Sequence, residues 1–184
     1  MYSYGLSNST EGPFITDLHD DWENGTVFDR DELMKYVTVA ENERFDYATV
    51  YYNQTQDVHP PLYYFFLHTV CSLFPGSFTK WTGIGLNFVF LGCTLAAMYA
   101  LALELLHDSK KALFACALYV FNRQAVTHFM LIRMYMLLTL LTVLLALLVA
   151  KSLHRPSIGK DLASGMRNCI HKKMSLWTPR PLMY

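Results

Sequence analysis

The chain has 184 residues, 53% of them hydrophobic, and its formal net charge at pH 7 is zero. This neutrality is a cancellation, because residues 1–58 carry 12 Asp/Glu and 3 Lys/Arg (net −9) while residues 59–184 carry 3 Asp/Glu and 12 Lys/Arg (net +9). Most apolar residues lie between positions 60 and 150, in runs comparable to the roughly 20 residues that a helix needs to cross a bilayer. This division argues against one soluble domain.

A soluble helical core is the alternative to membrane helices, and each of its helices would carry one polar stripe. Residues 137–150 have no such stripe, because Thr139 and Thr142 are their only polar residues. A threonine hydroxyl can bond back to its own helix backbone at little cost, even in lipid. We therefore predict an all-α integral membrane protein with three to four membrane-embedded helices, preceded by an external loop with short juxtamembrane helices.

The acidic external loop is expected to span residues 1–58 and to contain the short helices. One of these should start at Asp29, because Asp29 and Glu32 have the spacing of a capping box. Three Asn-x-Thr sequons lie in the same segment, at Asn8, Asn24 and Asn53. They mark glycosylated surface in a eukaryotic secretory protein, and the alternative is chance in a segment rich in Asn and Thr.

The transmembrane region is expected to span residues 59–150. Four apolar segments are predicted there, at residues 62–74, 81–106, 112–121 and 134–150. The polar run 122–124 separates the last two. The segment 112–121 is short enough to be re-entrant, and 62–74 is short for a full crossing unless its flanking prolines and aromatic residues extend it.

The tail, residues 151–184, is basic, and the positive-inside rule predicts that it is cytoplasmic; we also expect it to be poorly ordered. Four crossings would then put the acidic loop in the cytoplasm as well, although a segment of net charge −9 fits the outer face better. Either one apolar segment does not cross, or the tail is misleading. We expect a multi-pass protein of a bacterial plasma membrane, in contact with membrane lipid and with no nucleic-acid partner.

The first candidate site is the run from Asp57 to Leu62, at the start of the first apolar helix. Asp57 and His59 lie two residues apart, next to Pro60 and Pro61. At a helix N-terminus they could bind a divalent metal, with Asp57 as a ligand, or orient a phosphate. The alternative is a simple helix cap followed by a proline start.

The second candidate is Arg133, at the entrance of the last apolar segment. An arginine is costly inside lipid, so beside a membrane helix it either pairs with an anion or extends its charge to the interface. Its guanidinium can hold a phosphate through two parallel hydrogen bonds. Both readings are open on these grounds.

The run Asp57-Val58-His59-Pro60-Pro61-Leu62-Tyr63-Tyr64 resembles the motif that ends the first external loop of polytopic glycosyltransferases with the GT-C fold, especially protein O-mannosyltransferases and their bacterial relatives. Residues 112–138 are similar to a later helix pair of the bacterial branch. The resemblance covers residues 2–150, and the His-Pro-Pro-Leu element is its most specific part.

The resemblance implies inverting transfer of a sugar from a polyprenyl-phosphate donor to an acceptor on the external face. By position it implies that Asp57 and His59 are catalytic, that Asp57 could also meet a divalent metal, and that Arg133 binds the donor phosphate. It gives Pro60, Pro61 and Leu62 a structural role. The family's first membrane helix and its acidic pair would precede Tyr2, so we expect a fragment that does not catalyse transfer by itself.

Two alternatives come from other classes. The chain could be a non-catalytic membrane subunit or scaffold whose acidic loop binds a partner, or an inactive truncated gene product. A transporter or channel piece has less support, because Arg123 and Arg133 are the main charges within the apolar segments.

Overall fold

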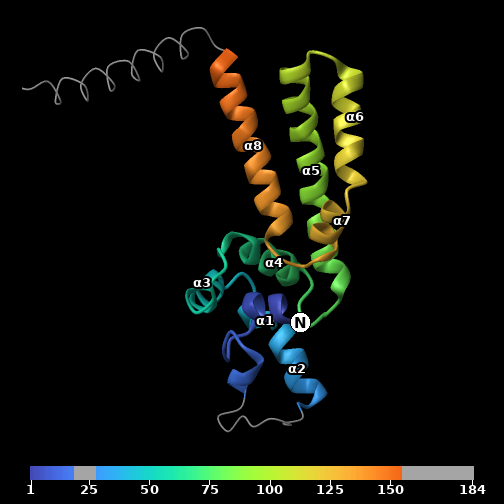
Figure 1. Ribbon diagram of the computed structural model, residues 1–184. Helices are drawn as coiled ribbons and strands as arrows, with labels where there is room; N and C mark the ends of the chain where they lie inside the picture. The colour runs from blue at the N-terminus through green and yellow to red at the C-terminus, as the bar shows by residue number, and fades with distance from the viewer. Residues whose placement is uncertain (19–27, 155–184) are drawn as a thin grey trace, which may run out of the picture.

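The computed structural model describes residues 1–18 and 28–154. This part of the chain contains helices and turns and no strand. Figure 1 shows a small helical head at one end and a group of long helices that extend away from it. The basic tail, apart from its first four residues, and the sequon at Asn24 lie outside the described residues.

The head is built from short helices that meet below the long ones (Figure 1). These helices are α1 (Tyr2–Asn8), α2 (Arg30–Val37) and α3 (Tyr47–Thr55), with 3-10 turns at Ile15–Leu18 and Glu41–Glu43. The predicted start of α2 is confirmed, because Asp29 is its N-cap and the Glu32 carboxylate accepts the Asp29 backbone N–H at 2.8 Å. The first short helix, α1, has no capping residue in the sequence, and its position was therefore not predicted.

The remaining helices are α4 (Leu62–Leu73), α5 (Lys80–Leu106), α6 (Ser109–Val120), α7 (Arg123–Met130) and α8 (Tyr135–His154). Their starts have local causes: the side chains of Thr79, Asp108 and Asn122 accept backbone N–H groups in the first turns of α5, α6 and α7. The predicted break at 122–124 is confirmed as the start of α7. The sequence did not predict α7 as a separate helix.

Two of the described helices, α5 and α8, are long and apolar enough to cross a membrane by length and composition. Only 22% of the most apolar stretch of α5 and 17% of that of α8 are buried, whereas a core helix of a soluble protein is mostly buried. The other two apolar segments, 62–74 and 112–121, form helices of only 12 residues each, α4 and α6.

The directions of the helices bear on the topology. α5 and α8 both run away from the head, while α6 and then α7 return toward it (Figure 1). α4 instead runs across the lower ends of the long helices, and it packs against α1, α3 and α5. The first apolar segment is therefore part of the junction with the head and not of the long bundle.

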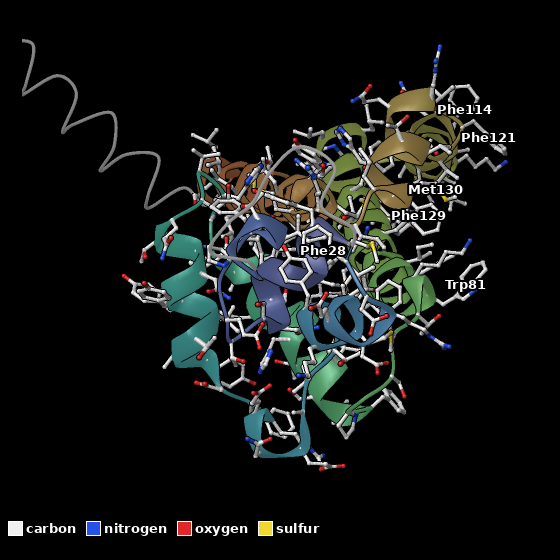
Figure 2. All side chains as sticks on the ribbon, turned by 90° about the horizontal axis from the view of Figure 1, so that it is seen from below. Phe28, Trp81, Phe114, Phe121, Phe129 and Met130 are labelled. Atoms are coloured by element: carbon white, nitrogen blue, oxygen red, sulfur yellow. The ribbon has the colours of Figure 1, made fainter. Side chains whose placement is uncertain are left out.

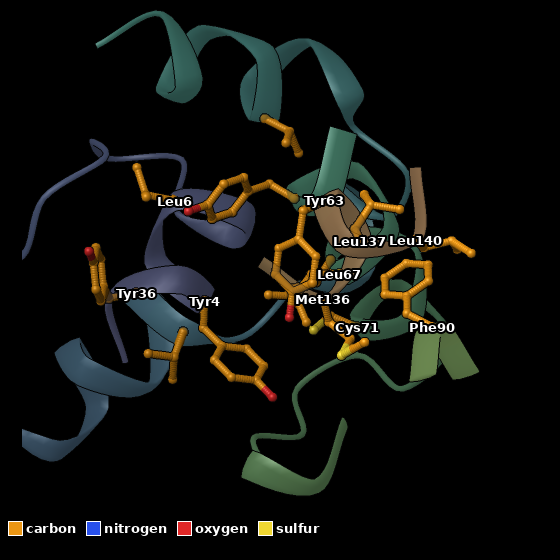
Figure 3. Packing of buried hydrophobic residues seen from close by; sticks show 14 of the residues in the cluster. Tyr4, Leu6, Tyr36, Tyr63, Leu67, Cys71, Phe90, Met136, Leu137 and Leu140 are labelled. Carbon is orange, nitrogen blue, oxygen red and sulfur yellow. The ribbon is translucent and has the colours of Figure 1, made fainter. Parts of the chain in front are cut away.

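The core lies at this junction between head and long helices. Figure 3 shows side chains from both parts packed together, with Tyr4 and Leu6 from α1 next to residues of α4, α5 and α8. The residues buried completely or nearly so include Leu6, Tyr63, Leu67 and Met136. The head and the start of the bundle therefore share one hydrophobic core.

The two described sequon asparagines have structural roles inside the head. Asn8 is buried and donates to the Val37 carbonyl at 2.8 Å, and Asn53 is buried and donates to the Ser9 carbonyl at 2.8 Å. Neither amide is accessible for glycosylation in this fold. This favours the chance interpretation of these two sequons.

Large apolar side chains cover much of the outside of the long helices. Trp81, Phe114, Phe121 and Met130 point outward in Figure 2, and each is more than half exposed. On α8 the exposed apolar residues are Leu138, Leu141, Leu144, Leu145, Leu148, Val149 and Leu153. An apolar surface of this extent is typical of a membrane or protein contact.

Candidate functional site

Asp57 and His59 lie in the short connection between α3 and α4. The last turn of α3 fixes this connection, because the backbone N–H of Asp57 donates to the Gln54 carbonyl at 3.3 Å. On the other side Pro61 is the N-cap of α4, with no side-chain cap hydrogen bond. Asp57 therefore does not cap α4, and the simple capping interpretation of this carboxylate is wrong.

The two side chains form a hydrogen-bonded pair. The Nδ1–H of His59 donates to Oδ2 of Asp57 at 2.7 Å, and the Tyr2 hydroxyl donates to Oδ1 at 3.1 Å. The Asp57 side chain is only 7% exposed and that of His59 15%. Since an ionised carboxylate only accepts, the bond fixes the proton of a neutral His59 on Nδ1 and leaves Nε2 as a proton acceptor.

The environment keeps Asp57 ionised. Burial raises the pKa of its carboxyl, but hydrogen bonds from His59, from the Val58 backbone and from Tyr2 lower it more, so the pKa lies below its usual value. The pKa of the Tyr2 phenol shifts in the opposite direction, because burial and the hydrogen-bonded Asp57 carboxylate raise it. Tyr2 therefore stays protonated and donates.

Arg133 lies in the connection between α7 and α8, which is held from two sides. The side-chain amide of Asn87, in α5, donates to the carbonyls of Phe129 and Leu131 at 3.0 and 2.7 Å. The Ser3 hydroxyl, in α1, donates to the Ile132 carbonyl. These bonds fix the backbone on either side of Arg133 and so position its side chain.

The guanidinium of Arg133 lies against Tyr2, the residue that also donates to Asp57. Its Cζ lies 5.4 Å from the centroid of the Tyr2 ring, a cation–π contact. Among the described residues no carboxylate lies within ion-pair distance of it. Arg133 is therefore a half-buried cation without a counter-ion from this part of the chain.

Tyr64 completes the group. Its hydroxyl is buried and has no hydrogen-bond partner in the described structure. Burial raises the pKa of this phenol, the Asp57 carboxylate raises it further, and the Arg133 guanidinium opposes both. Tyr64 thus lies within electrostatic range of both charges. We call Tyr2, Asp57, His59, Tyr64 and Arg133 the Asp57–Arg133 cluster.

The structure therefore brings together residues from two sequence motifs that are far apart in the chain. It also adds Tyr2 and Tyr64, to which the sequence analysis gave no role. Tyr64 belongs to the run that carries the family resemblance, and this membership could have marked it as a candidate site residue. Tyr2 had no signal, because its role depends on the position of α1 beneath both connections.

Pro60, Pro61 and Leu62 behave as elements of the helix start. Pro61 has the αR conformation, with φ −71° and ψ −21°, and its carbonyl accepts the backbone N–H groups of Tyr64 and Phe65. Leu62 is 44% exposed and Pro60 is exposed. None of these side chains can act on a substrate chemically, and a rigid chain entry is their contribution.

A metal centre is not evident in the described part of the chain. No group of three or more His, Cys, Asp or Glu side chains there could hold an ion. Asp57 has one such neighbour, His59, and both of its oxygens already accept hydrogen bonds. A metal at Asp57 would need ligands from a substrate, from water or from residues outside the described ranges.

One cavity of about 280 Å³ lies in the head, away from the cluster. It is lined by Ser9, Thr10, Glu11, Lys35, Tyr36, Thr38, Ala40 and Glu43. It shares no lining residue with the Asp57–Arg133 cluster, so it is not the space in which those residues would meet a ligand.

The comparisons with known proteins leave the family open. No family model matches the chain, and neither a curated protein nor a solved structure matches it. Any functional assignment therefore rests on the cluster itself. Its parts are a guanidinium without a counter-ion among the described residues, a phenol without a hydrogen-bond partner among them, and a histidine oriented by a carboxylate, which together can hold an anion and accept a proton.

Proposed function

We propose that the chain is the donor-site part of a membrane glycosyltransferase that moves a sugar from a polyprenyl-phosphate donor to an acceptor on the external face. The observation that supports this most is the Arg133 guanidinium beside the Asp57–His59 pair, with Tyr2 between them. A phosphate needs a cation and hydrogen-bond donors, and sugar transfer needs a base near the acceptor.

The roles follow from the charges. Arg133 would bind the donor phosphate, with the unpartnered Tyr64 hydroxyl as an additional donor. The acceptor hydroxyl attacks the anomeric carbon and its proton passes to Nε2 of His59. The bond between that carbon and the phosphate oxygen breaks, and the lipid phosphate leaves with the electron pair. Asp57 stabilises the imidazolium that forms.

For the membrane arrangement we propose three crossings in a multi-pass plasma-membrane protein. α5 and α8 would each cross once in the same direction. α6 and α7, at 12 and 8 residues, are together about 30 Å long at 1.5 Å per residue, close to the thickness of the hydrocarbon core. An odd number of crossings leaves the acidic head on the face opposite the tail.

Three lysines support this orientation, although Lys80 and Arg133 lie at the head end of the long helices. Lys110 and Lys111 at the start of α6 and Lys151 near the end of α8 lie at the end of the bundle away from the head. Basic residues concentrate on the cytoplasmic side of membrane helices. The proposed arrangement therefore puts the head and the Asp57–Arg133 cluster outside.

The test is turnover of a lipid-linked sugar in lipid nanodiscs by the protein with a membrane helix that ends in an acidic pair added before Tyr2, because the family resemblance implies that transfer needs both. Radiolabelled polyprenyl-phosphate mannose and glucose are the probes, and release of polyprenyl phosphate is measured with and without added membrane extract as acceptor. We expect release that falls at least tenfold in Asp57→Asn and in His59→Gln, and that is unchanged in the matched control Asp31→Asn, an exposed carboxylate of α2. Equal release in all four proteins, or none in the unsubstituted protein with the added helix, would overturn the catalytic proposal.

A non-catalytic membrane subunit is the second candidate, and one observation favours it. Both oxygens of Asp57 accept hydrogen bonds from the protein itself, as in a purely structural cluster. In that case the variants would lose thermal stability without any turnover to lose. The same reconstituted proteins therefore separate the two candidates.

A further inference from the structure

α4 has two faces of unlike character. Leu62, Phe66 and Leu73 are 44%, 42% and 55% exposed. They fall on one stripe, because residues four and eleven positions apart lie on the same side of an α-helix. Val70 lies beside this stripe and is partly buried. The outer face of α4 is thus almost entirely apolar.

The opposite face of α4 is buried and carries polar groups. His68 is 2% exposed and its Nδ1–H donates to the Ser7 carbonyl at 2.8 Å. Ser72 is fully buried and its hydroxyl accepts the Phe45 backbone N–H at 3.1 Å. The hydroxyl of Tyr64 is on this side as well. A helix on the surface of a water-soluble protein has the reverse arrangement, with polar groups outside.

The one hydroxyl on the outer stripe has partners inside the protein. Thr69 donates to the Phe65 carbonyl at 2.7 Å and lies 2.9 Å from the Tyr47 hydroxyl. The outer face therefore offers water no free polar side chain. Contact of these apolar side chains with water is unfavourable, and removing their exposed parts from water would stabilise the protein.

The size and direction of α4 exclude a crossing. Its 12 residues are about 18 Å long, well short of the roughly 30 Å of hydrocarbon. It runs across the ends of the long helices (Figure 1). The Phe66 ring contacts that of Phe90 in α5, with centroids 5.5 Å apart, so the outer stripe adjoins the exposed apolar surface of α5, which includes Phe88 and Val89.

We propose that α4 lies in the plane of the membrane surface, with Leu62, Phe66 and Leu73 inserted at the boundary between lipid headgroups and acyl chains. The occupant of this face is lipid, because the stripe is continuous with the apolar surface of the long helices and lies near the start of α8. This placement puts the Asp57–Arg133 cluster, just before α4 and α8, at the depth of the lipid phosphates. It does not depend on the proposed sugar transfer.

The test measures the depth of single tryptophans in a background in which Trp22, Trp81 and Trp177 are replaced by Phe. Phe66→Trp and Leu73→Trp report on α4. Leu145→Trp, on the exposed side of α8, is the deep control, and Tyr51→Trp, exposed on α3 in the head, is the aqueous control. The proteins are reconstituted in phosphatidylcholine brominated near the headgroup, midway along the chain or near the chain end, and fluorescence quenching is measured.

We expect the tryptophans at positions 66 and 73 to be quenched most by bromine near the headgroup, and to about the same extent. Position 145 should be quenched most by bromine near the chain end. Maximal quenching of positions 66 and 73 by the deepest bromine would mean that α4 crosses, and would overturn the proposal. Absence of quenching by any of the lipids would mean that water or a second protein covers this face, and would overturn it equally. Because two positions on α4 are measured in separate variants, the result does not depend on the correct folding of a single variant.

Discussion

The Tyr2 hydroxyl donates a hydrogen bond to Oδ1 of Asp57 at 3.1 Å. The ring of the same tyrosine lies against the Arg133 guanidinium. One residue of the first helix therefore joins the carboxylate before α4 to the cation before α8. The geometry of the whole cluster depends on the position of α1, and several consequences can be measured.

Tyr2→Phe should raise the pKa of Asp57. The ring and its contact with Arg133 remain, but one hydrogen bond to the carboxylate is lost, which costs about 1 kcal/mol of stability. Because the folded pKa of Asp57 is lowered, its contribution to stability is present above the unfolded value of about 3.9 and is lost as the pH falls below it. An NMR titration of the labelled Asp57 carboxyl carbon measures the change. Tyr52→Phe, exposed on α3, is the control, and an unchanged Asp57 titration in Tyr2→Phe would contradict the contact.

The stability of the head should fall in mild acid because of His68. Burial lowers the pKa of this imidazole, with partial compensation from the Ser7 carbonyl and the Asp46 carboxylate. The unfolded chain therefore binds the proton more readily, and stability that is complete above the unfolded pKa of about 6.5 is lost as the pH drops below it. The thermal midpoint should decrease between pH 8 and pH 5.5. His68→Gln should flatten this dependence and His107→Asn should not; a wild-type midpoint that is independent of pH would contradict the prediction.

Gly5→Ala should destabilise the head strongly. A Cβ at this position would collide with the Tyr36 ring, whose hydroxyl is itself fixed to the Pro13 carbonyl at 2.9 Å. Such overpacking costs about 1–3 kcal/mol. Gly85→Ala is the matched control, because a Cβ there meets nothing within 4 Å and alanine favours a helix by about 1 kcal/mol. The two thermal midpoints should therefore move in opposite directions.

Asn87→Ala should loosen the connection that carries Arg133. The substitution removes both hydrogen bonds from the amide to the Phe129 and Leu131 carbonyls, and we expect a loss of about 1–3 kcal/mol. Hydrogen exchange of the backbone amides around Arg133 should become faster. The control is Thr94→Ala, which removes another buried polar group from α5. The Thr94 hydroxyl bonds only within its own helix, so hydrogen exchange around Arg133 should stay unchanged in this variant.

The sequence predicted the helices well where a local rule applies. Asp29 and Glu32 located the start of α2, and the polar run at 122–124 located the break before α7. The prolines before Leu62 located the start of α4. In each case the cause is a capping side chain or a residue that cannot continue a helix, and such causes act within a few positions.

The arrangement of α4 could not be predicted in this way. Its composition is that of a membrane helix, and only the packing of its polar residues, such as His68 and Ser72, against α1 and the chain before α3 shows which face is inside. The sequence likewise proposed Asp57, His59 and Arg133 as candidates but could not show that they meet. That depends on Tyr2, whose partners are tens of residues away.

The measurement that tests the central claim most directly is equilibrium binding of radiolabelled polyprenyl phosphate to the protein in nanodiscs. It is compared in the wild type, in Arg133→Gln and in Arg123→Gln, with polyprenol lacking the phosphate as a second ligand. If the Asp57–Arg133 cluster is a phosphate site, Arg133→Gln weakens binding of the phosphate at least tenfold. Arg123→Gln, an exposed charge at the start of α7, should leave it unchanged, and polyprenol should bind all three proteins equally and weakly. Equal binding of polyprenyl phosphate to Arg133→Gln and the wild type would contradict the account.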